Sequence, residues 1–405
     1  MEKNVSIWVT AFFALLLTVS FQNCSNSAAP DVSRKSSSSD STNETLAKKS
    51  CNLDSGAILQ HGESSDTEYY ASAAVGCGQS CELAAVTCDD GNLTGPGTSP
   101  TCNVTACDAK SSSGDIVNGL IPNKKYMVTV HGITESRDGG DPLGKVSIKN
   151  CQGIEIAATG EAPINWHDGQ APQTANLVVT APADGCISAD TDFGDARHIT
   201  AVETTDDAQS VTGNSVIGLQ PGKDYLMSAY GYTTNRGDGD RTLLPVSFLD
   251  CADDSVVAST NQFNINWHDG QTSQEVTMPV TAPASGCVKA TTDFGDAFNV
   301  TAVPIHKSAQ VIAGNELTLS QPGKSYFVHV YGLTEDRGQG NNDLQPIGVT
   351  DCNGTSLASV SAVTINWHDG QTAHSAGFVI TAPADGCIRG VTDIGPAEQL
   401  SAMEL

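Results

Sequence analysis

The stretches "KYMVTVHGI" at residues 125–133 and "DYLMSAYGY" at residues 224–232 decide the fold class. Their residues alternate with a period of two, which is typical of a β-strand that buries one face. Two further stretches, "ANLVVTAPA" (175–183) and "AGFVITAPA" (376–384), are rich in β-branched residues and end at proline. No segment after the apolar run at the N-terminus shows the 3.6-residue period of an amphipathic helix. The sequence therefore predicts an all-β protein.

These strands belong to a unit that recurs three times, with each copy of "INWHDGQ" about 100 residues from the next. The copies start at Ile164, Ile265 and Ile365. A unit of this length is the size of a domain and not of a solenoid repeat. Turn signals such as Pro221-Gly222 and Asp385-Gly386 recur at short spacing, which favours antiparallel sandwiches. We predict three tandem antiparallel β-sandwich repeats of about 100 residues, at 103–197, 198–298 and 299–405.

The second copy shows a family resemblance in the order of its motifs. It reads "LQPGKDYLMSAYGYT … PVSFLDC … NINWHDGQ … VTMPVTAPASGCVKA … TDFGDA" between residues 219 and 297. This order is similar to jelly-roll modules of the carbohydrate-binding and galactose-binding-like type. The resemblance covers about 300 residues as three copies and implies a jelly-roll-like sandwich. It implies sugar binding only by analogy of fold.

The N-terminus resembles a bacterial lipoprotein signal peptide. A short polar start is followed by an apolar run from Ile7 to Phe21, and then by "FQNC" with Cys24 as the residue that would be acylated. Asn23 departs from the small residue usual before such a cysteine, so ordinary cleavage near Ala28 is the competing interpretation. We expect a signal peptide at 1–23 and a polar, lipid-anchored tether at 24–50, and hence a membrane-anchored lipoprotein of the cell envelope, at the outer membrane or cell surface.

Cysteine usage agrees with export. The chain has 13 cysteines, so acylation of Cys24 leaves an even number that can pair. The segment 51–102 holds five of them and resembles small Cys-rich β modules of bacterial surface proteins; its pairing stays open. Each repeat holds two cysteines 35 or 36 residues apart, and the simplest pairing is one disulfide per repeat: Cys151–Cys186, Cys251–Cys287 and Cys352–Cys387.

The charge balance excludes one class of partner. Asp plus Glu number 46 against 20 Lys plus Arg, a net charge of −26, which repels nucleic acid. Acidic, Gly-rich loops offer oxygen ligands for Ca²⁺ at Asp138, Asp141, Asp238 and Asp240. The third copy carries Gln339 and Asn341 there, and a solvated loop is the competing interpretation. No other cofactor is expected.

The Trp-His-Asp cluster of "INWHDGQ" has two interpretations. In the first, Trp stacks on a sugar or lines a ligand groove with His and with the Arg and Asp that recur in each copy. In the second, Ile and Trp fill the core, and Asp-Gly forms a type I′ hairpin turn, which leaves only the His unexplained. The candidate ligand-binding residues are Arg137, Trp166, His167, Asp192, Arg236, Trp267, His268, Asp293, Arg337, Trp367, His368 and Asp393.

Catalysis is not expected, because no "GxSxG", "HExxH" or phosphate-binding Gly loop is present. The leading hypothesis is a non-enzymatic exported surface lipoprotein whose tandem modules serve adhesion or ligand binding and raise apparent affinity. A glycan or a cell-surface protein is the candidate partner. The first alternative is a carbohydrate-binding protein with one Trp-His site per repeat. The second alternative is a structural spacer without a ligand.

Overall fold

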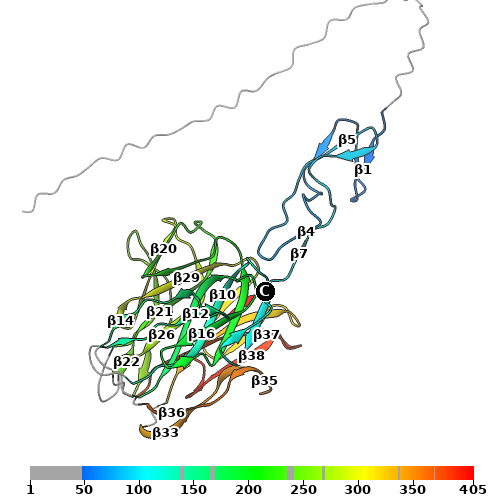
Figure 1. Ribbon diagram of the computed structural model, residues 1–405. Coiled ribbons are helices and arrows are strands. Elements are labelled where there is room, and N and C mark those ends of the chain that lie inside the picture. The colour runs from blue at the N-terminus through cyan, green and yellow to red at the C-terminus, as the bar shows by residue number, and fades with distance from the viewer. Residues whose placement is uncertain are drawn as a thin grey trace, which may run out of the picture. The chain divides into compact units, whose positions relative to one another are not determined.

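The computed structural model (Figure 1) describes residues 48–136, 141–164, 169–234, 241–266, 270–335, 338–368 and 370–405. For residues 162–163, 241, 338–341 and 367–368 it describes the backbone alone. Every element in the described residues is a β-strand. Accordingly, no helix in this part of the chain could cross a membrane.

The Cys-rich module is built from short strands and three disulfides. Its strands are β1 (Cys51–Asn52), β2 (Ile58–Leu59), β3 (Ser64–Ser65), β4 (Ala74–Val75), β5 (Val86–Asp89), β6 (Asn92–Thr94) and β7 (Asn103–Val104). Its disulfides are Cys51–Cys88, Cys77–Cys107 and Cys81–Cys102. Its core is small, around Leu53, Tyr69 and Val86, so the disulfides supply constraints that burial cannot.

The first sandwich has eight main strands in two antiparallel sheets. Its strands are β8 (Ala109–Ser112), β9 (Ile116–Val117), β10 (Lys125–Ile133), β11 (Pro142–Leu143), β12 (Ser147–Asn150), β13 (Glu155–Ala158), β14 (Ala162–Pro163), β15 (Pro172–Thr180), β16 (Ile187–Thr191), β17 (Gly194–Asp195) and β18 (His198–Thr204). One sheet has the order β8-β18-β10-β15, and the other has β9-β16-β12-β13. Numbered along the chain, these orders are 1-8-3-6 and 2-7-4-5, the topology of a jelly roll.

The other two sandwiches repeat this topology strand for strand. The second has β19 (Gln209–Thr212), β20 (Ser215–Ile217), β21 (Asp224–Tyr232), β22 (Arg241–Leu243), β23 (Ser247–Asp250), β24 (Val256–Ser259), β25 (Phe263–Ile265), β26 (Ser273–Thr281), β27 (Cys287–Thr292), β28 (Gly295–Asp296) and β29 (Asn299–Pro304). The third has β30 (Ala309–Ala313), β31 (Glu316–Thr318), β32 (Ser325–Leu333), β33 (Gly338–Leu344), β34 (Ile347–Asp351), β35 (Ser356–Val360), β36 (Val363–His368), β37 (Ala373–Thr381), β38 (Cys387–Thr392), β39 (Gly395–Pro396) and β40 (Gln399–Glu404). The predicted fold class is confirmed.

The strand pairing shows repeat boundaries that differ from those predicted from the sequence. The sequence places the start of the second and third repeats at His198 and Asn299, but β18 pairs with β10 of the first sandwich, and β29 pairs with β21 of the second. The sandwiches therefore span 109–204, 209–304 and 309–404. Likewise β7, at 103–104, pairs with β4 of the Cys-rich module and lies outside the first sandwich.

The predicted pair of cysteines in each repeat forms a disulfide: Cys151–Cys186, Cys251–Cys287 and Cys352–Cys387. Each joins the turn after one strand of the second sheet to the start of its neighbouring strand. A closed loop of about 35 residues stabilises a fold by roughly 3–4 kcal/mol in the chain-entropy model.

The three sandwiches close into a ring through their first sheets, and the closure repeats one hydrogen bond three times. The hydroxyl of Thr301 donates to the Asn176 carbonyl at 2.7 Å, and the hydroxyl of Ser401 donates to the Thr277 carbonyl at 2.6 Å. The third bond runs from Thr200 back to the Gly377 carbonyl at 2.8 Å, so the last sandwich contacts the first. Strands β15, β26 and β37 contact one another at the centre of the ring.

The hydrophobic cores also extend across these contacts. Tyr230 and Tyr232 of the second sandwich pack into the core of the first, and Tyr331 and Leu333 of the third pack into the core of the second. Ile133 of the first packs with Leu344 and Ile365 of the third. The three sandwiches therefore pack against one another and are not independent domains in a row. Residues 49–405 form one compact unit.

Candidate functional site

Each "INWHDGQ" copy lies between strands of different sheets. In the third sandwich β36, which contains Ile365, pairs with β33, whereas β37 after the motif pairs with β32. The predicted hairpin turn at Asp-Gly is therefore wrong, because the flanking strands do not pair with each other. The glycines Gly169, Gly270 and Gly370 do have the positive φ that a tight turn needs. The three isoleucines are buried, as the core interpretation requires.

The side chains that prompted the ligand prediction lie outside the described residues. These are Arg137, Trp166, His167, Arg236, Trp267, His268, Arg337, Trp367 and His368, together with the Ca²⁺ candidates Asp138, Asp238 and Asp240 and the acylation candidate Cys24. Of the Ca²⁺ candidates Asp141 alone is described, and it is exposed. Its backbone carbonyl accepts the N–H of Ile164, which brings the acidic loop and the motif side by side.

The recurring aspartates Asp192, Asp293 and Asp393 hold that loop at both ends. In the second sandwich the two carboxylate oxygens of Asp293 accept the backbone N–H groups of Thr234 at 2.6 Å and Leu244 at 2.8 Å. Asp192 and Asp393 make the equivalent pairs of bonds at the two ends of their loops. Carboxylates that accept two backbone N–H groups are well suited to fixing loop geometry. The structure thus accounts for these three residues by loop anchoring.

The described flanks of the three motifs meet across the ring. The side-chain carbonyl of Gln170, at the end of the first motif, accepts the backbone N–H of Asn366 in the third motif at 3.0 Å. The side-chain carbonyl of Gln371, at the end of the third, accepts the N–H of Asn266 in the second at 2.9 Å. The Trp, His and Asp of each copy stand between such an Asn and Gln in the sequence. The described ends of the three copies are therefore joined to one another across the ring.

Contacts just below these flanks hold the three sandwiches together. The hydroxyls of Thr272 and Thr372, each directly after a motif glutamine, hydrogen-bond to each other. The hydroxyl of Ser273 donates to the carbonyl of Pro172 at 2.9 Å. All of these side chains are buried. The arrangement fixes the motif ends on a rigid base, which is the condition for a preorganised binding surface.

Deeper in the ring lies a buried carboxylate that the sequence analysis missed. Glu275 on β26 is 2% exposed and accepts hydrogen bonds from all three sandwiches. Its donors to Oε1 are Asn176 at 2.8 Å, Ser228 at 2.9 Å and Thr277 at 2.7 Å. Its donors to Oε2 are His329 at 2.8 Å and Ser375 at 2.7 Å.

The environment of Glu275 favours its charged form. Burial by itself raises the pKa of the carboxyl, but His329 and the hydrogen bonds from His329, Ser375 and Thr277 outweigh burial and hold the pKa below its ordinary value. A buried charge of this kind is tolerated only when it is fully hydrogen-bonded. Glu275 is therefore a structural centre of the ring. A single Glu among β-branched residues, at a position where the other copies have Thr174 and Ser375, is the signal that could have revealed it.

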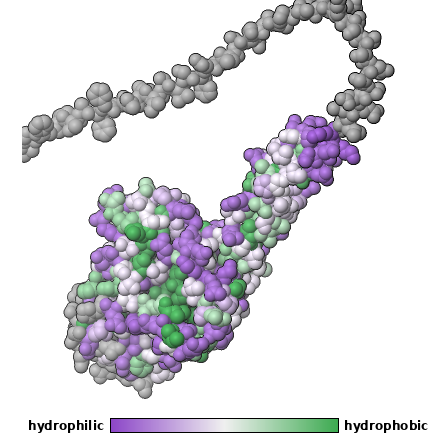
Figure 2. Space-filling model, turned by 45° about the horizontal axis from the view of Figure 1, so that its top comes forward, coloured by the Kyte–Doolittle hydropathy of each residue, from purple (hydrophilic) through white to green (hydrophobic). Residues whose placement is uncertain are grey.

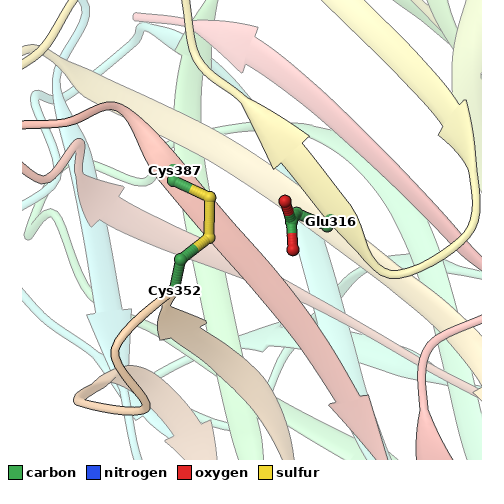
Figure 3. A group of neighbouring side chains, drawn as sticks. All are labelled: Glu316, Cys352 and Cys387. Atoms are coloured by element: carbon green, nitrogen blue, oxygen red, sulfur yellow. A yellow bond between two sulfur atoms is a disulfide. The ribbon is translucent and has the colours of Figure 1, made fainter.

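One group of potential metal ligands occurs among the described residues, and its chemistry excludes a thiolate site. Figure 3 shows Glu316 beside Cys352 and Cys387, whose sulfur atoms are joined in a disulfide. Disulfide sulfurs are not thiolates and so do not provide the usual cysteine ligands of a metal. The carboxylate of Glu316 is paired with the guanidinium of Arg389 at 2.8 Å.

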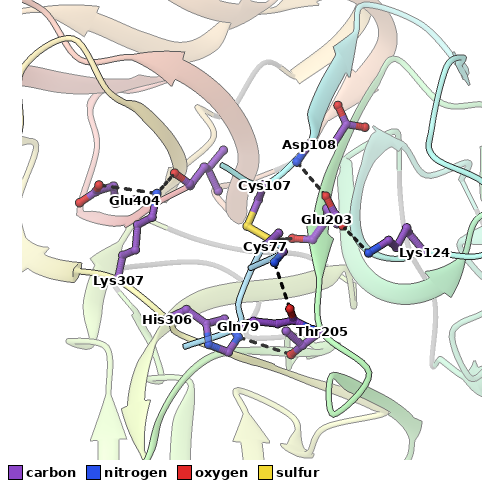
Figure 4. Close-up of a disulfide and its surroundings, with 12 residues drawn as sticks. Cys77, Gln79, Cys107, Asp108, Lys124, Glu203, Thr205, His306, Lys307 and Glu404 are labelled. Carbon is purple, nitrogen blue, oxygen red and sulfur yellow. Dashed lines mark hydrogen bonds and ion pairs between the residues drawn. A yellow bond between two sulfur atoms is a disulfide. The ribbon is translucent and has the colours of Figure 1, made fainter. Parts of the chain in front are cut away.

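A cavity of about 170 Å³ lies where the Cys-rich module joins the ring. Figure 4 shows the Cys77–Cys107 disulfide, which lies next to it, and the surrounding side chains. The walls of the cavity are largely apolar and include Val104, Val303 and Met403. Its charged side chains are already paired: Glu203 lies 3.3 Å from Lys124, and Glu404 lies 3.8 Å from Lys307. Beside it, the Cys77–Cys107 disulfide and the bond from the Asp108 N–H to Glu203 attach the module. These contacts are those of a structural joint.

Large apolar side chains remain exposed at one position that recurs in the three sandwiches. Phe193, Phe294 and Ile394 directly follow the anchoring aspartates and are 41%, 43% and 37% exposed. The face drawn in Figure 2 also carries hydrophobic residues among hydrophilic ones. Single exposed apolar side chains are common on soluble proteins, so these three residues do not by themselves define a site.

Comparison with known proteins leaves the family open. No family model matches the chain, and no curated protein matches it. Among solved structures it is similar to the N-terminal CBM22-1-CBM22-2 tandem domain from Paenibacillus barcinonensis Xyn10C. That match has 8% identity and a TM-score of 0.14, and it covers 50% of this chain and 85% of that chain. Because a similarity of this size carries no functional argument, the fold assignment rests on the strand pairing described above.

Proposed function

We propose that this protein is an exported, non-enzymatic lipoprotein of the cell envelope that binds its ligand through one composite surface built from all three "INWHDGQ" copies. The observation that carries the proposal is the pair of bonds Gln170–Asn366 and Gln371–Asn266, which join motif ends from different sandwiches. The ligand class that we propose is a glycan, or a protein displayed on a cell surface. Six disulfides among the described residues support export.

This proposal changes the expected stoichiometry of binding. Three independent sites, one per repeat, would bind three ligand molecules per chain, and a composite surface binds one. A screen of soluble glycans and cell-envelope fragments against the chain from residue 49 onward identifies a ligand, and calorimetry then counts it. A value near one supports the composite surface. A value near three contradicts it, and the absence of any ligand favours the spacer.

Variants of the motif test which residues take part. We expect Trp267→Ala or His268→Ala to reduce binding at least tenfold with an unchanged melting temperature. Gln371→Ala removes the acceptor of the Asn266 N–H and should weaken binding as well. Gln220→Ala, at an exposed glutamine outside the motifs, is the matched control and should bind like the wild type. Equal binding by all four variants would exclude the motifs from the ligand surface.

The anchor is tested separately. In the proposal Cys24 carries the lipid, so Cys24→Ser should move the protein from the membrane fraction to the soluble fraction of the cell envelope. A Ser27→Ala variant controls for changes near the processing site. Retention of Cys24→Ser in the membrane fraction contradicts acylation at this residue and leaves the binding surface unaffected.

A further inference from the structure

The ring has three seams between sandwiches, and they are not chemically equal. In the seam between the first and second sandwiches, the side-chain amide of Gln173 donates to the hydroxyl of Tyr230 at 3.0 Å. In the seam between the second and third, Gln274 donates to Tyr331 at 3.1 Å. Both pairs consist of groups that keep their charge state between pH 4 and pH 8.

The seam between the third and first sandwiches has histidines at the same places. His374 on β37 takes the position of Gln173 and Gln274, and His131 on β10 takes the position of the two tyrosines. Their rings stack with centroids 5.5 Å apart. His198 on β18 is the register partner of His131, at the position where the other copies have Asn299 and Gln399. All three histidines are buried.

The burial of His131 and His198 favours neutral rings. His131 Nδ1 lies 2.9 Å from the Thr174 hydroxyl and 3.1 Å from the Ser375 carbonyl, which can accept a hydrogen bond donated by the ring. Burial lowers the pKa of His131 well below its ordinary value, and the nearby His374 and His198 lower it further. Burial also lowers the pKa of His198, to about 4. Protonation therefore places like charges next to one another in a buried site.

In the part of the chain that the structure describes, the charged groups around His131 and His198 do not offset such charges. The buried titratable groups that face the cluster in the described residues are the three histidines, Glu275 on β26 and His329 on β32. Glu275 lies beyond Ser375, and both of its oxygens are already hydrogen-bonded, with Oε2 held by His329 and Ser375. Arg197, next to His198 in the chain, is exposed. A protonated His131 or His198 thus gains no free carboxylate in the described residues.

This seam is also the one without a covalent connection across it. The first and second sandwiches are joined by residues 205–208, and the second and third by residues 305–308. Within the described residues, the third and first are joined by packing and by bonds such as Thr200 to Gly377. A ring opens most readily where no linker holds the two sides together.

We propose that the seam between the third and first sandwiches is an acid-sensitive joint, which opens when His131, His198 and His374 are protonated while the two Gln–Tyr seams stay closed. The direction follows from linkage. A histidine whose pKa is depressed in the closed state contributes stability that is present above pH 6.5 and is lost as the pH falls toward about 4. Each pKa unit of depression corresponds to about a tenfold change in the opening equilibrium.

Hydrogen exchange of the full chain, corrected for the intrinsic pH dependence of amide exchange, tests this joint. Between pH 7.5 and pH 5 we expect protection in β10 and β37 to fall at least tenfold, and protection in β21 and β26 to fall less than about threefold. A loss of protection that is equal in the three seams, or absent from β10 and β37, overturns the proposal.

Residues at equivalent positions of the three seams can be exchanged to give matched variants. His131→Tyr with His198→Asn and His374→Gln installs the residues of the other seams, and this variant should keep its protection in β10 and β37 at pH 5. Tyr331→His with Gln274→His transfers the histidine pair to the second seam, and protection in β26 and β32 should then become acid-sensitive. If the first variant retains the wild-type acid response, the histidines are not the cause. The second variant gives an independent answer if the first does not fold.

Discussion

At the scale of single residues, Glu275 matters most. Its carboxylate takes five hydrogen bonds from three sandwiches, so it contributes more to the relation between sandwiches than to the core of any one of them. The cost of burying a charge is large, and only this complete set of donors offsets it. Removal of the carboxylate would leave five buried donors without their acceptor.

We expect Glu275→Ala to lower the free energy of unfolding by about 3–5 kcal/mol, because it breaks a buried charged network. Urea denaturation at pH 7.5 measures this change. Glu155→Ala, at a carboxylate that is 42% exposed and paired with Lys145, is the control and should change stability by less than about 0.5 kcal/mol. Equal effects of the two substitutions would refute a central role for Glu275.

The effect of Glu275 should also depend on pH. Its pKa is depressed in the folded state, so its contribution is present above the ordinary value of 4.5 and is lost as the pH falls through the lower folded pKa. The difference in stability between the wild type and Glu275→Gln should therefore be larger at pH 7 than at pH 3. A difference that grows on acidification would contradict the assignment of a charged carboxylate.

At the scale of elements, the long strands and their turns follow from local sequence. The alternation in residues 125–133 and 224–232 predicts strands that the structure contains as β10 and β21. The residue at which each sandwich begins could not be predicted from the sequence. The spacing of the motifs gives the length of the repeat, and this length is the same wherever the repeat is taken to start. Strand pairing alone shows that β18 closes the first sandwich.

The loops after these strands illustrate a second limit of local sequence. Because Asp192, Asp293 and Asp393 recur in the three copies, the sequence analysis predicted that they bind a ligand. Their role became visible only where the fold brings the N–H groups at both ends of a loop to one carboxylate. Those N–H groups are about 50–60 residues away in the chain.

Asp293→Ala should therefore loosen the loop between Thr234 and Leu244. Two part-buried N–H groups lose their acceptor, and we expect a cost of about 1 kcal/mol, read from the melting temperature. Asp296→Ala changes an exposed carboxylate of the same "TDFGDA" motif and serves as the control. If Asp293→Ala melts like the wild type, loop anchoring is not the role of this residue.

At the scale of the whole molecule, the repeats are parts of one ring. The sequence predicted three sandwiches, and it contained no sign that Tyr230 and Tyr331 complete the cores of their predecessors or that Thr200 bonds back to Gly377. Contacts between segments almost 200 residues apart depend on tertiary packing, which no local pattern encodes. For the same reason, the bonds that join the ends of the three "INWHDGQ" copies could not be predicted from the sequence.

The most direct test of this arrangement is the radius of gyration of residues 49–405 in solution, measured by X-ray scattering at pH 7.5. A closed ring of this length should give about 20–25 Å, the value of a compact body with a small attached module. Three sandwiches strung in a row should give about 30 Å or more. The smaller value is the one that the ring predicts, and the larger value would contradict both the closed ring and the composite surface that depends on it.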